Sequence, residues 1–247
     1  MTTSFLPPAL DGADDINHAL RSQGYAALAA ADFAQAADCD LAQLYAFNPL
    51  WNELPPDAYL KDGGRYRRRR HSCFVVTGGR LEPVAHRAHW QPVEYNALHG
   101  GMQRWFEPMA PQMVNHPAWQ KLLVWLAAVS SRATMGQPWF VEAHQFRIDT
   151  TDGIGRPTPE GAHRDGVDFV AVFLVDRVNV KGGETRVFDA NGPAGQRFTL
   201  TESWSLLLLD DARVIHESTP IQPLAAGGYR DTLVVTLRSG GFQGQTV

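Results

Sequence analysis

The chain has 247 residues and a formal net charge of −4, and 44% of its residues are hydrophobic. This composition provides a buried core and excludes a disordered chain, while the acidic balance argues against a general polyanion binder. The first residues lack the basic region and the apolar region that are typical of a secretory leader. The chain contains two cysteines and has no apolar stretch near the roughly 18 residues of a membrane span. We therefore expect a cytoplasmic protein with neither a nucleic-acid partner nor a membrane partner.

Residues 1–135 are predicted to form a mostly helical flank with one β segment. Apolar residues recur at helical spacing in the alanine-rich stretch from Ala13 to Ala46, where Gly24 separates two expected helices. An apolar stripe in residues 116–135 predicts an amphipathic helix. Residues 80–110 contain three histidines and two tryptophans without a metal-ligand spacing, and we expect a loop there.

Residues 139–238 are predicted to form the β core. At least six short segments rich in β-branched and aromatic residues follow one another at roughly even spacing, with Gly, Pro, Asp or Asn between them. This pattern is typical of a sandwich or jelly-roll barrel. No internal repeat or linker divides the chain, so we expect a single domain over residues 1–247 that is mainly β with flanking α-helices.

A His-x-Asp pair, His163 and Asp165, stands at the start of one β segment. Residues two apart in an extended chain project to the same side, so this imidazole and carboxylate can share a metal ion. His216, in a later β-prone run, offers a third ligand. Two histidines and one carboxylate that leave positions open form the facial triad of non-haem Fe(II) oxygenases. The pair alone is a weak signal, and the prediction depends on the joint pattern.

Arg230 and Thr232 stand two apart on the last predicted strand. A planar guanidinium and a hydroxyl on one strand face suit bidentate capture of a carboxylate. This pair therefore adds a predicted anion site to the predicted metal site.

Five arginines between residues 65 and 70 form the most basic segment of the chain. They lack the stacking aromatics and the wider basic field that nucleic-acid binding uses. On a strand, Arg67 and Arg69 share one face. That face either reaches into a cavity and binds a substrate carboxylate or stays in solvent, and the sequence leaves both alternatives open.

Three further residues are candidates for the substrate site. Glu160 lies just before the His-x-Asp pair and is a candidate partner for a substrate ammonium group. Gln145 and Arg147, two apart on the first β segment of the core, are candidate cavity-lining residues, with a purely structural role as the alternative.

The chain resembles the bacterial Fe(II)/2-oxoglutarate dioxygenases that hydroxylate free aliphatic L-amino acids such as L-isoleucine. Four segments carry the resemblance: DGGRYRRRRHSCF, PTPEGAHRDGVDFV, ARVIHESTPI and GYRDTLVVTL. It implies a double-stranded β-helix (jelly-roll or cupin-like) core, with His163, Asp165 and His216 holding iron. It also implies that Arg230 and Thr232 bind the distal carboxylate of 2-oxoglutarate, that O2 is the oxidant, and that the enzyme hydroxylates a small substrate, the side chain of a free aliphatic L-amino acid.

Two other functions stay open from the residues alone. A zinc-dependent hydrolase uses similar ligands with an activated water, although this leaves the Arg230 and Thr232 pair unexplained. A metal-binding or regulatory protein of the same fold, acting in a stress or biofilm-type response, would keep the ligands without turnover. The oligomeric state is open as well, with a homodimer as one alternative.

Overall fold

The protein is described by a computed structural model that covers residues 8–135 and 137–244. Its helical segments are η1 (Ala13–Asp15), α1 (Ile16–Gln23), α2 (Ala30–Ala36), α3 (Leu41–Tyr45), η2 (Asn48–Glu53), α4 (Pro111–Val114) and α5 (Pro117–Ala133). Its strands are β1 (Tyr25–Leu28), β2 (Arg67–Thr77), β3 (Arg80–Pro83), β4 (Trp139–Asp149), β5 (Phe169–Val178), β6 (Val180–Gly182), β7 (Thr185–Asp189), β8 (Gly195–Phe198), β9 (Leu206–Asp210), β10 (Val214–Ser218), β11 (Ile221–Pro223) and β12 (Tyr229–Ser239).

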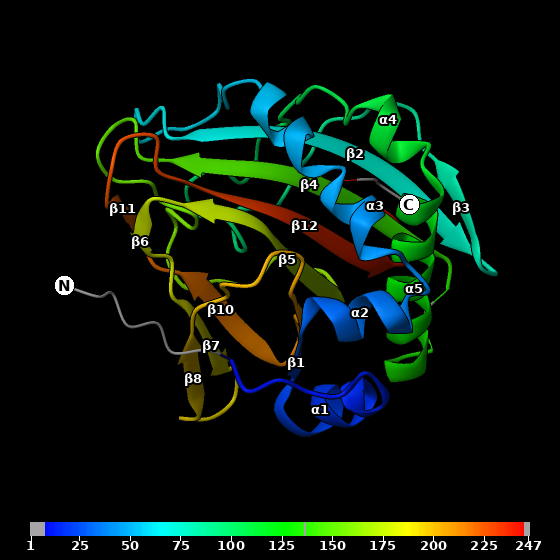
Figure 1. Cartoon of the computed structure of the whole chain (residues 1–247). Helices are drawn as coiled ribbons and strands as arrows, with labels where there is room; N and C mark the ends of the chain where they lie inside the picture. The colour runs from blue at the N-terminus through cyan, green and yellow to red at the C-terminus, as the bar shows by residue number, and fades with distance from the viewer. Residues whose placement is uncertain (1–7, 136, 245–247) are drawn as a thin grey trace.

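Seven strands form one antiparallel sheet in the order β1-β9-β5-β12-β4-β2-β3. A three-stranded sheet, β10-β7-β8, and a two-stranded sheet, β11-β6, complete the β structure. Figure 1 shows α2, α3 and α5 gathered beside the large sheet, with β7, β8 and β10 lying away from α5. The predicted mainly β, jelly-roll architecture with flanking helices is confirmed.

The large sheet is buried on both faces, and β5 illustrates how its side chains alternate. Ala171 and Phe173 pack in the cluster that includes the helices. Val170 and Leu174 point the other way and pack with residues of the three-stranded sheet, such as Val187 in β7. Because side chains alternate along a strand, the odd-numbered residues from Phe169 to Val175 face the helices, and the even-numbered residues from Val170 to Leu174 face the three-stranded sheet.

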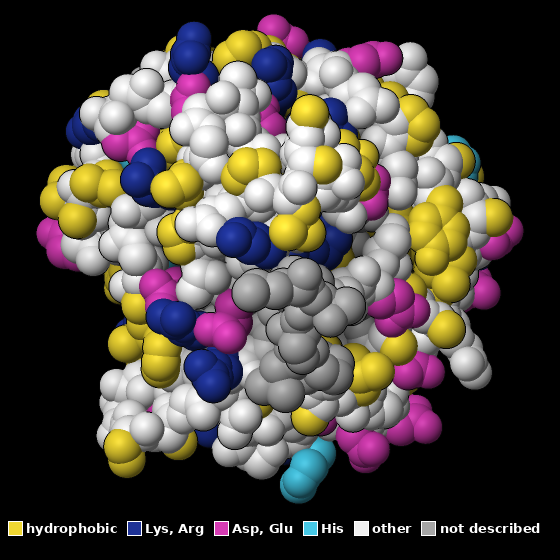
Figure 2. Space-filling model, turned by 60° about the vertical axis from the view of Figure 1, so that its left-hand side comes forward, with side chains coloured by type: hydrophobic (Ala, Val, Ile, Leu, Met, Phe, Trp, Pro, Cys, Tyr) yellow, Lys and Arg dark blue, Asp and Glu magenta, His cyan; other side chains and the backbone are white. Residues whose placement is uncertain are grey.

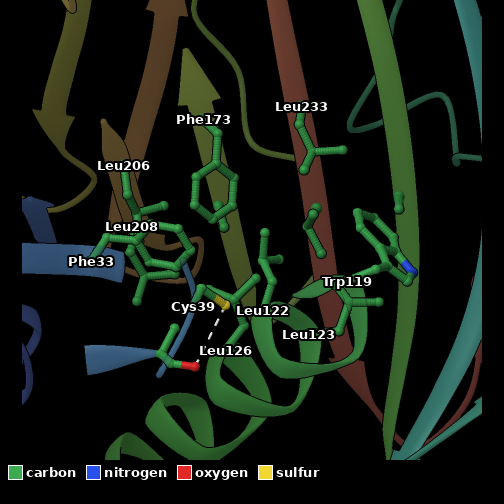
Figure 3. Close-up of a cluster of buried hydrophobic side chains, with 14 of the residues drawn as sticks. Phe33, Cys39, Trp119, Leu122, Leu123, Leu126, Phe173, Leu206, Leu208 and Leu233 are labelled. Carbon is green, nitrogen blue, oxygen red and sulfur yellow. Dashed lines mark hydrogen bonds between the residues drawn. The ribbon is translucent and has the colours of Figure 1, made fainter. Parts of the chain in front are cut away.

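Helix α5 supplies much of the first cluster. Its residues Trp119, Leu122, Leu123 and Leu126 are fully buried, and Figure 3 shows them packed beside side chains of the large sheet such as Phe173. Fully burying a leucine side chain stabilises the fold by about 1.5–3 kcal/mol. The predicted amphipathic helix is confirmed, and one core joins both halves of the chain. The single-domain organisation stays a prediction.

The N-terminal flank contains more β structure than predicted. The first helix ends as expected at Gly24, whose backbone is left-handed with φ of 81° and whose N–H caps the carbonyl of Leu20. The next residues, Tyr25–Leu28, form β1, which pairs with β9. The prediction of a single β segment in residues 1–135 was wrong, because tertiary pairing overrides the helix propensity of a short alanine-rich run.

No helix in the two described stretches is long and apolar enough to cross a membrane. The predicted N-terminal flank includes residues 1–7, which lie outside the described residues.

Candidate functional site

The structure brings His163, Asp165 and His216 together. His163 and Asp165 lie in the segment before β5, and His216 lies in β10. The backbone N–H of each histidine donates to the carbonyl of the other, at 3.0 and 2.9 Å, so the pairing of these two segments sets the rings side by side. We call these three residues the triad.

The triad donors converge without bonding to one another. His163 Nε2 lies 3.8 Å from Asp165 Oδ1, and His216 Nε2 lies 3.6 Å from Asp165 Oδ2. These separations are too long for hydrogen bonds. Two ligands that each bind one ion at about 2.1 Å lie roughly 3–4 Å apart. The donor set therefore fits a divalent metal ion.

Neighbouring groups orient the triad. His163 Nδ1 donates to the carbonyl of Gly161 at 2.9 Å, which directs the lone pair of Nε2 toward the other two donors. Burial alone would lower the pKa of His163, but the carboxylates of Asp165 and Glu160 raise it. Burial lowers the pKa of His216 to about 3, with a contribution from His163. His216 is thus neutral, as a metal ligand must be.

The loop that carries Asp165 is fastened by a buried carboxylate. Asp211 accepts hydrogen bonds from the backbone N–H groups of Asp165, Gly166 and Val167, at 3.0, 2.8 and 3.1 Å. Gly166 has a left-handed backbone with φ of 75°, and its Cα lies against the ring of Tyr95, where a Cβ would clash. The turn after the His-x-Asp pair therefore requires glycine.

The triad lines a cavity of about 140 Å³ together with alternate residues of β12, β4 and β2. Strand register places these residues in two rows across the three strands, Arg230, Ile148 and Arg67 in one row and Thr232, Phe146 and Arg69 in the next. The predicted anion site and the arginine segment thus share one wall of the cavity with an apolar patch.

Arg230 is buried in this wall, with 3% of its surface exposed. Its Nε has no hydrogen-bond partner among residues 8–135 and 137–244. Burial lowers its pKa to about 10, so it remains charged at neutral pH. A buried guanidinium with an unsatisfied donor is suited to an anionic ligand.

Arg67 and Arg69 also point into the cavity, with 5% and 3% exposure. Arg67 Nε donates to Asp57 Oδ2 at 2.7 Å, and Arg69 Nη2 donates to His144 Nδ1 at 2.8 Å. The rings of Phe106 and Phe146 hold the guanidinium of Arg69, at 3.9 and 4.4 Å from their centroids. The sequence left open whether this face of the strand reaches into a cavity or stays in solvent. In the structure it reaches into the cavity.

On the face of the molecule in Figure 2, positively and negatively charged side chains are interspersed. Figure 2 shows a face on which Lys and Arg side chains lie beside Asp and Glu side chains. Arg67 and Arg69 are buried and add their charge to the cavity instead.

Of the remaining predicted substrate residues, one lines the cavity and two do not. Glu160 lines the cavity, with Oε1 at 3.5 Å from His163 Nε2 and no partner for Oε2 in the described part of the chain. The expectation that Gln145 and Arg147 line the cavity is corrected. Both lie on the helix face of β4, where Arg147 pairs with Asp231 at 2.6 Å. Both faces of this strand are buried, so the sequence pattern does not distinguish them.

A second group of histidine and acidic side chains lies beside the cavity, and its donor atoms are also within 4.8 Å of one another. It comprises His71, His89, Glu142 and His144, which we call the histidine cluster. Glu142 Oε2 accepts from His71 Nε2 at 2.9 Å and from His89 Nδ1 at 2.6 Å. Burial alone would raise the pKa of Glu142, but these two imidazoles lower it. Burial lowers the pKa of His89 to about 3, so the cluster is a carboxylate held by neutral rings.

Sequence reasoning missed several cavity residues in the segment 80–110, which it treated as a loop. His89, Gln91, Asn96 and Arg104 all line the cavity. They come from irregular backbone that has no periodicity, and only the density of polar and aromatic residues marks the segment. Backbone pairing of His89 with Arg104 closes this loop over the site.

The sequence model of 2OG-Fe dioxygenases matches residues 48–236. The solved structure of a bsmA homolog from Methylobium petroleophilum PM1 has 52% sequence identity and a TM-score of 0.92, covering 99% of this chain and 100% of that one. No curated protein matches the sequence.

Two more distant structures share the fold. IDO from Bacillus thuringiensis has 18% identity and a TM-score of 0.76, covering 93% of this chain and 100% of its own. The Fe(II)/α-ketoglutarate-dependent dioxygenase TqaL has 18% identity and a TM-score of 0.71, covering 94% of this chain and 88% of its own.

Proposed function

Because the chain belongs to the 2OG-Fe dioxygenase family, we propose that His163, Asp165 and His216 hold its Fe(II) and that Arg230, with Thr232, binds 2-oxoglutarate. The family uses Fe(II), 2-oxoglutarate and O2, and the chain is a dioxygenase on this ground. The observation that carries the proposal is the convergence of three unbonded donors on a cavity whose opposite wall contains the buried guanidinium of Arg230.

The histidine cluster fits this role less well than the triad. Its carboxylate is already hydrogen-bonded to two of its rings. Arg69 donates to His144 Nδ1, so the proton of that neutral ring lies on Nε2, the nitrogen that faces Glu142. Positive charge from Arg69 and Arg104 nearby also opposes a divalent cation.

The bound iron would supply O2 activation and hydroxylation of an unactivated C–H bond. The chain's own residues fix its ligands and orient the two organic molecules. Arg230 suits the distal carboxylate of 2-oxoglutarate because a guanidinium fork binds a carboxylate through two hydrogen bonds. The hydroxyl of Thr232, in the neighbouring row, would donate one more hydrogen bond to that carboxylate.

The proposed substrate is a free aliphatic L-amino acid hydroxylated on its side chain. Arg67 and Arg69 would bind its α-carboxylate, and Glu160 would bind its ammonium group. Apolar cavity residues, Phe146, Ile148, Pro157, Val172 and Val234, would surround the side chain. An apolar pocket discriminates one methylene by only about 1–3 kcal/mol, so isoleucine, leucine and methionine should be accepted at graded rates. The corresponding amides should be rejected strongly, because they leave the guanidinium groups unpaired.

The test combines binding and turnover. Anaerobic titration with Fe(II) and 2-oxoglutarate should produce the weak visible charge-transfer band of the chelate. The protein with Fe(II), ascorbate and 2-oxoglutarate is then offered the standard free amino acids, and a mass gain of one oxygen atom is sought. Absence of the band would overturn the proposed iron and 2-oxoglutarate sites. The band without hydroxylated product would remove the amino-acid substrate and leave the dioxygenase in place.

A cytoplasmic setting is also part of this proposal. Both cysteines, Cys39 and Cys73, are buried as free thiols. Burial raises the pKa of Cys39 to about 11, which favours an unreactive thiol.

A further inference from the structure

The loop 80–110 connects the substrate wall of the cavity to the proposed iron ligands, and this link rests on the proposed function. Arg104 is buried in the cavity with 2% exposure. Its Nη2 donates to Gln91 Oε1 at 2.9 Å, and its Nε has no partner within the described residues. Arg67 Nη2 and Arg69 Nε, in the same cavity, also lack partners there.

The charges of the wall leave room for one anion. Three guanidinium groups, those of Arg67, Arg69 and Arg104, lie near three carboxylates, those of Asp57, Glu142 and Glu160. The histidines between them are neutral because burial lowers their pKa. Because the proposed function assigns Glu160 to the substrate ammonium group, Asp57 and Glu142 leave one guanidinium charge for a substrate carboxylate. Arg104 supplies an unsatisfied donor for that carboxylate.

Gln91 joins Arg104 to Asp165. Its Oε1 accepts from Arg104 Nη2 and from Asn96 Nδ2, at 2.9 and 3.1 Å. Because both neighbours are donors, the atom of the Gln91 amide that faces them is its oxygen. The other end, Nε2, donates to Asp165 Oδ1 at 3.0 Å. One amide thus touches both the arginine of the substrate wall and the carboxylate of the triad.

We propose that Arg104 binds the substrate carboxylate together with Arg67 and Arg69, and that Gln91 is a positioning residue that links the Arg104 guanidinium to Asp165, so that substrate and metal binding are coupled. A carboxylate on Arg104 fixes the guanidinium, which fixes the amide and holds Asp165 in its metal-binding orientation. By linkage, the substrate then tightens the metal and the metal tightens the substrate by the same factor.

The test measures Mn(II) binding, so no turnover is needed. Mn(II) is titrated into the metal-free full chain alone, with L-isoleucine and with 3-methylpentanoate, which is the same acid without its amino group. In the wild type each acid should lower the Kd for Mn(II) at least about fivefold. In Gln91→Leu, which keeps the size of the side chain, the same ratio should fall below about twofold.

Gln243→Ala is the matched control, because Gln243 Nε2 also reaches Asp165 but donates to its backbone carbonyl at 2.9 Å. It should keep the wild-type ratio. Arg104→Lys keeps the charge and loses the fork, and it should weaken binding of both acids at least about tenfold. This variant tests the arginine independently if Gln91→Leu does not fold.

The outcomes separate this inference from the proposed function. Undiminished coupling in Gln91→Leu, unchanged affinity for the acids in Arg104→Lys, or no effect of either acid in the wild type would each overturn the inference. A response to 3-methylpentanoate but not to L-isoleucine would remove the amino-acid substrate and leave the coupling in place.

Discussion

The triad and the histidine cluster contain the same kinds of side chain and differ in where their lone pairs point. In the triad, His163, Asp165 and His216 come from the segment before β5 and from β10, and their donors face a common space. In the histidine cluster, three rings surround Glu142, and two of them bond to it directly. A cluster of possible ligands therefore becomes a metal site only when its donors are left without each other as partners.

The two groups also differ in the residues that hydrogen-bond to them from outside the group. The triad is supported by backbone groups and by neutral or anionic side chains such as Gln91 and Asp211. The histidine cluster instead binds a positively charged side chain, because His144 Nδ1 accepts a hydrogen bond from Arg69. The histidine cluster therefore holds Arg69 in the cavity wall, whereas the triad is the proposed metal site.

Removal of a triad ligand is expected to have the largest effect. Asp165→Ala should weaken Mn(II) binding by more than about 100-fold, because even the loss of a group that only orients a ligand costs 10–100-fold. Succinate formation should be lost with it. Metal titration and a succinate assay measure the two effects, and His71→Ala is the control from the histidine cluster. Wild-type metal affinity in Asp165→Ala, together with lost affinity in His71→Ala, would reverse the two assignments.

Removal of the carboxylate of the histidine cluster should instead cost stability. Glu142→Ala leaves two buried ring donors without an acceptor, and the free energy of unfolding should fall by about 3–5 kcal/mol. Urea unfolding measures this, and Glu142→Gln, which retains one acceptor, should recover part of it. Metal content should stay at that of the wild type. A loss of one bound metal ion per chain would mean that the cluster is itself a metal site.

The two faces of the large sheet provide the next test. Arg230→Ala, on the cavity face, should raise the KM for 2-oxoglutarate at least about tenfold, and Arg230→Lys should recover only part of the loss. Arg147→Ala, on the helix face, removes the ion pair with Asp231 and should change stability with little change in that KM. Equal KM values in wild type and Arg230→Ala would exclude Arg230 from the cosubstrate site.

The prediction with the smallest effect per step concerns the pH dependence of stability, where one step is one pH unit. The pKa of His89 is lowered to about 3 from an ordinary value of 6.5, so the unfolded chain binds a proton that the folded chain does not. Stability should therefore fall as pH decreases from about 6.5 toward 3, by up to about 1.4 kcal/mol per pH unit for this one group. His89→Gln should have a shallower slope in urea unfolding between these limits. An identical slope would mean that His89 is protonated in the folded protein.

Several features of the fold and site could be predicted because they depend on residues close in sequence. The stripe of α5, the spacing of His163 and Asp165, and the spacing of Arg230 and Thr232 follow from the periods of helix and strand. The even spacing of short β-prone segments, with turn residues between them, likewise predicted the mainly β architecture. These patterns are local, so a single sequence contains them.

Other features depended on tertiary structure. The sequence places Gln145 and Arg147 on one face of β4 and leaves undecided which face meets the cavity, because β4 is covered on both sides. The β1 strand exists through its pairing with β9, a partner distant in sequence. Gln91 and Arg104 reach the site from a loop whose path no periodicity specifies.

The sequence by itself determined the chemical types of the site, namely two histidines, an aspartate and several arginines on β segments. Only the tertiary structure decided which of them meet. The pairing of His163 with His216, the burial of Arg67 and Arg69, and the bond from Gln91 to Asp165 all join residues from separate segments. Such contacts depend on how the sheets pack across the cavity, and that packing is a property of the whole chain.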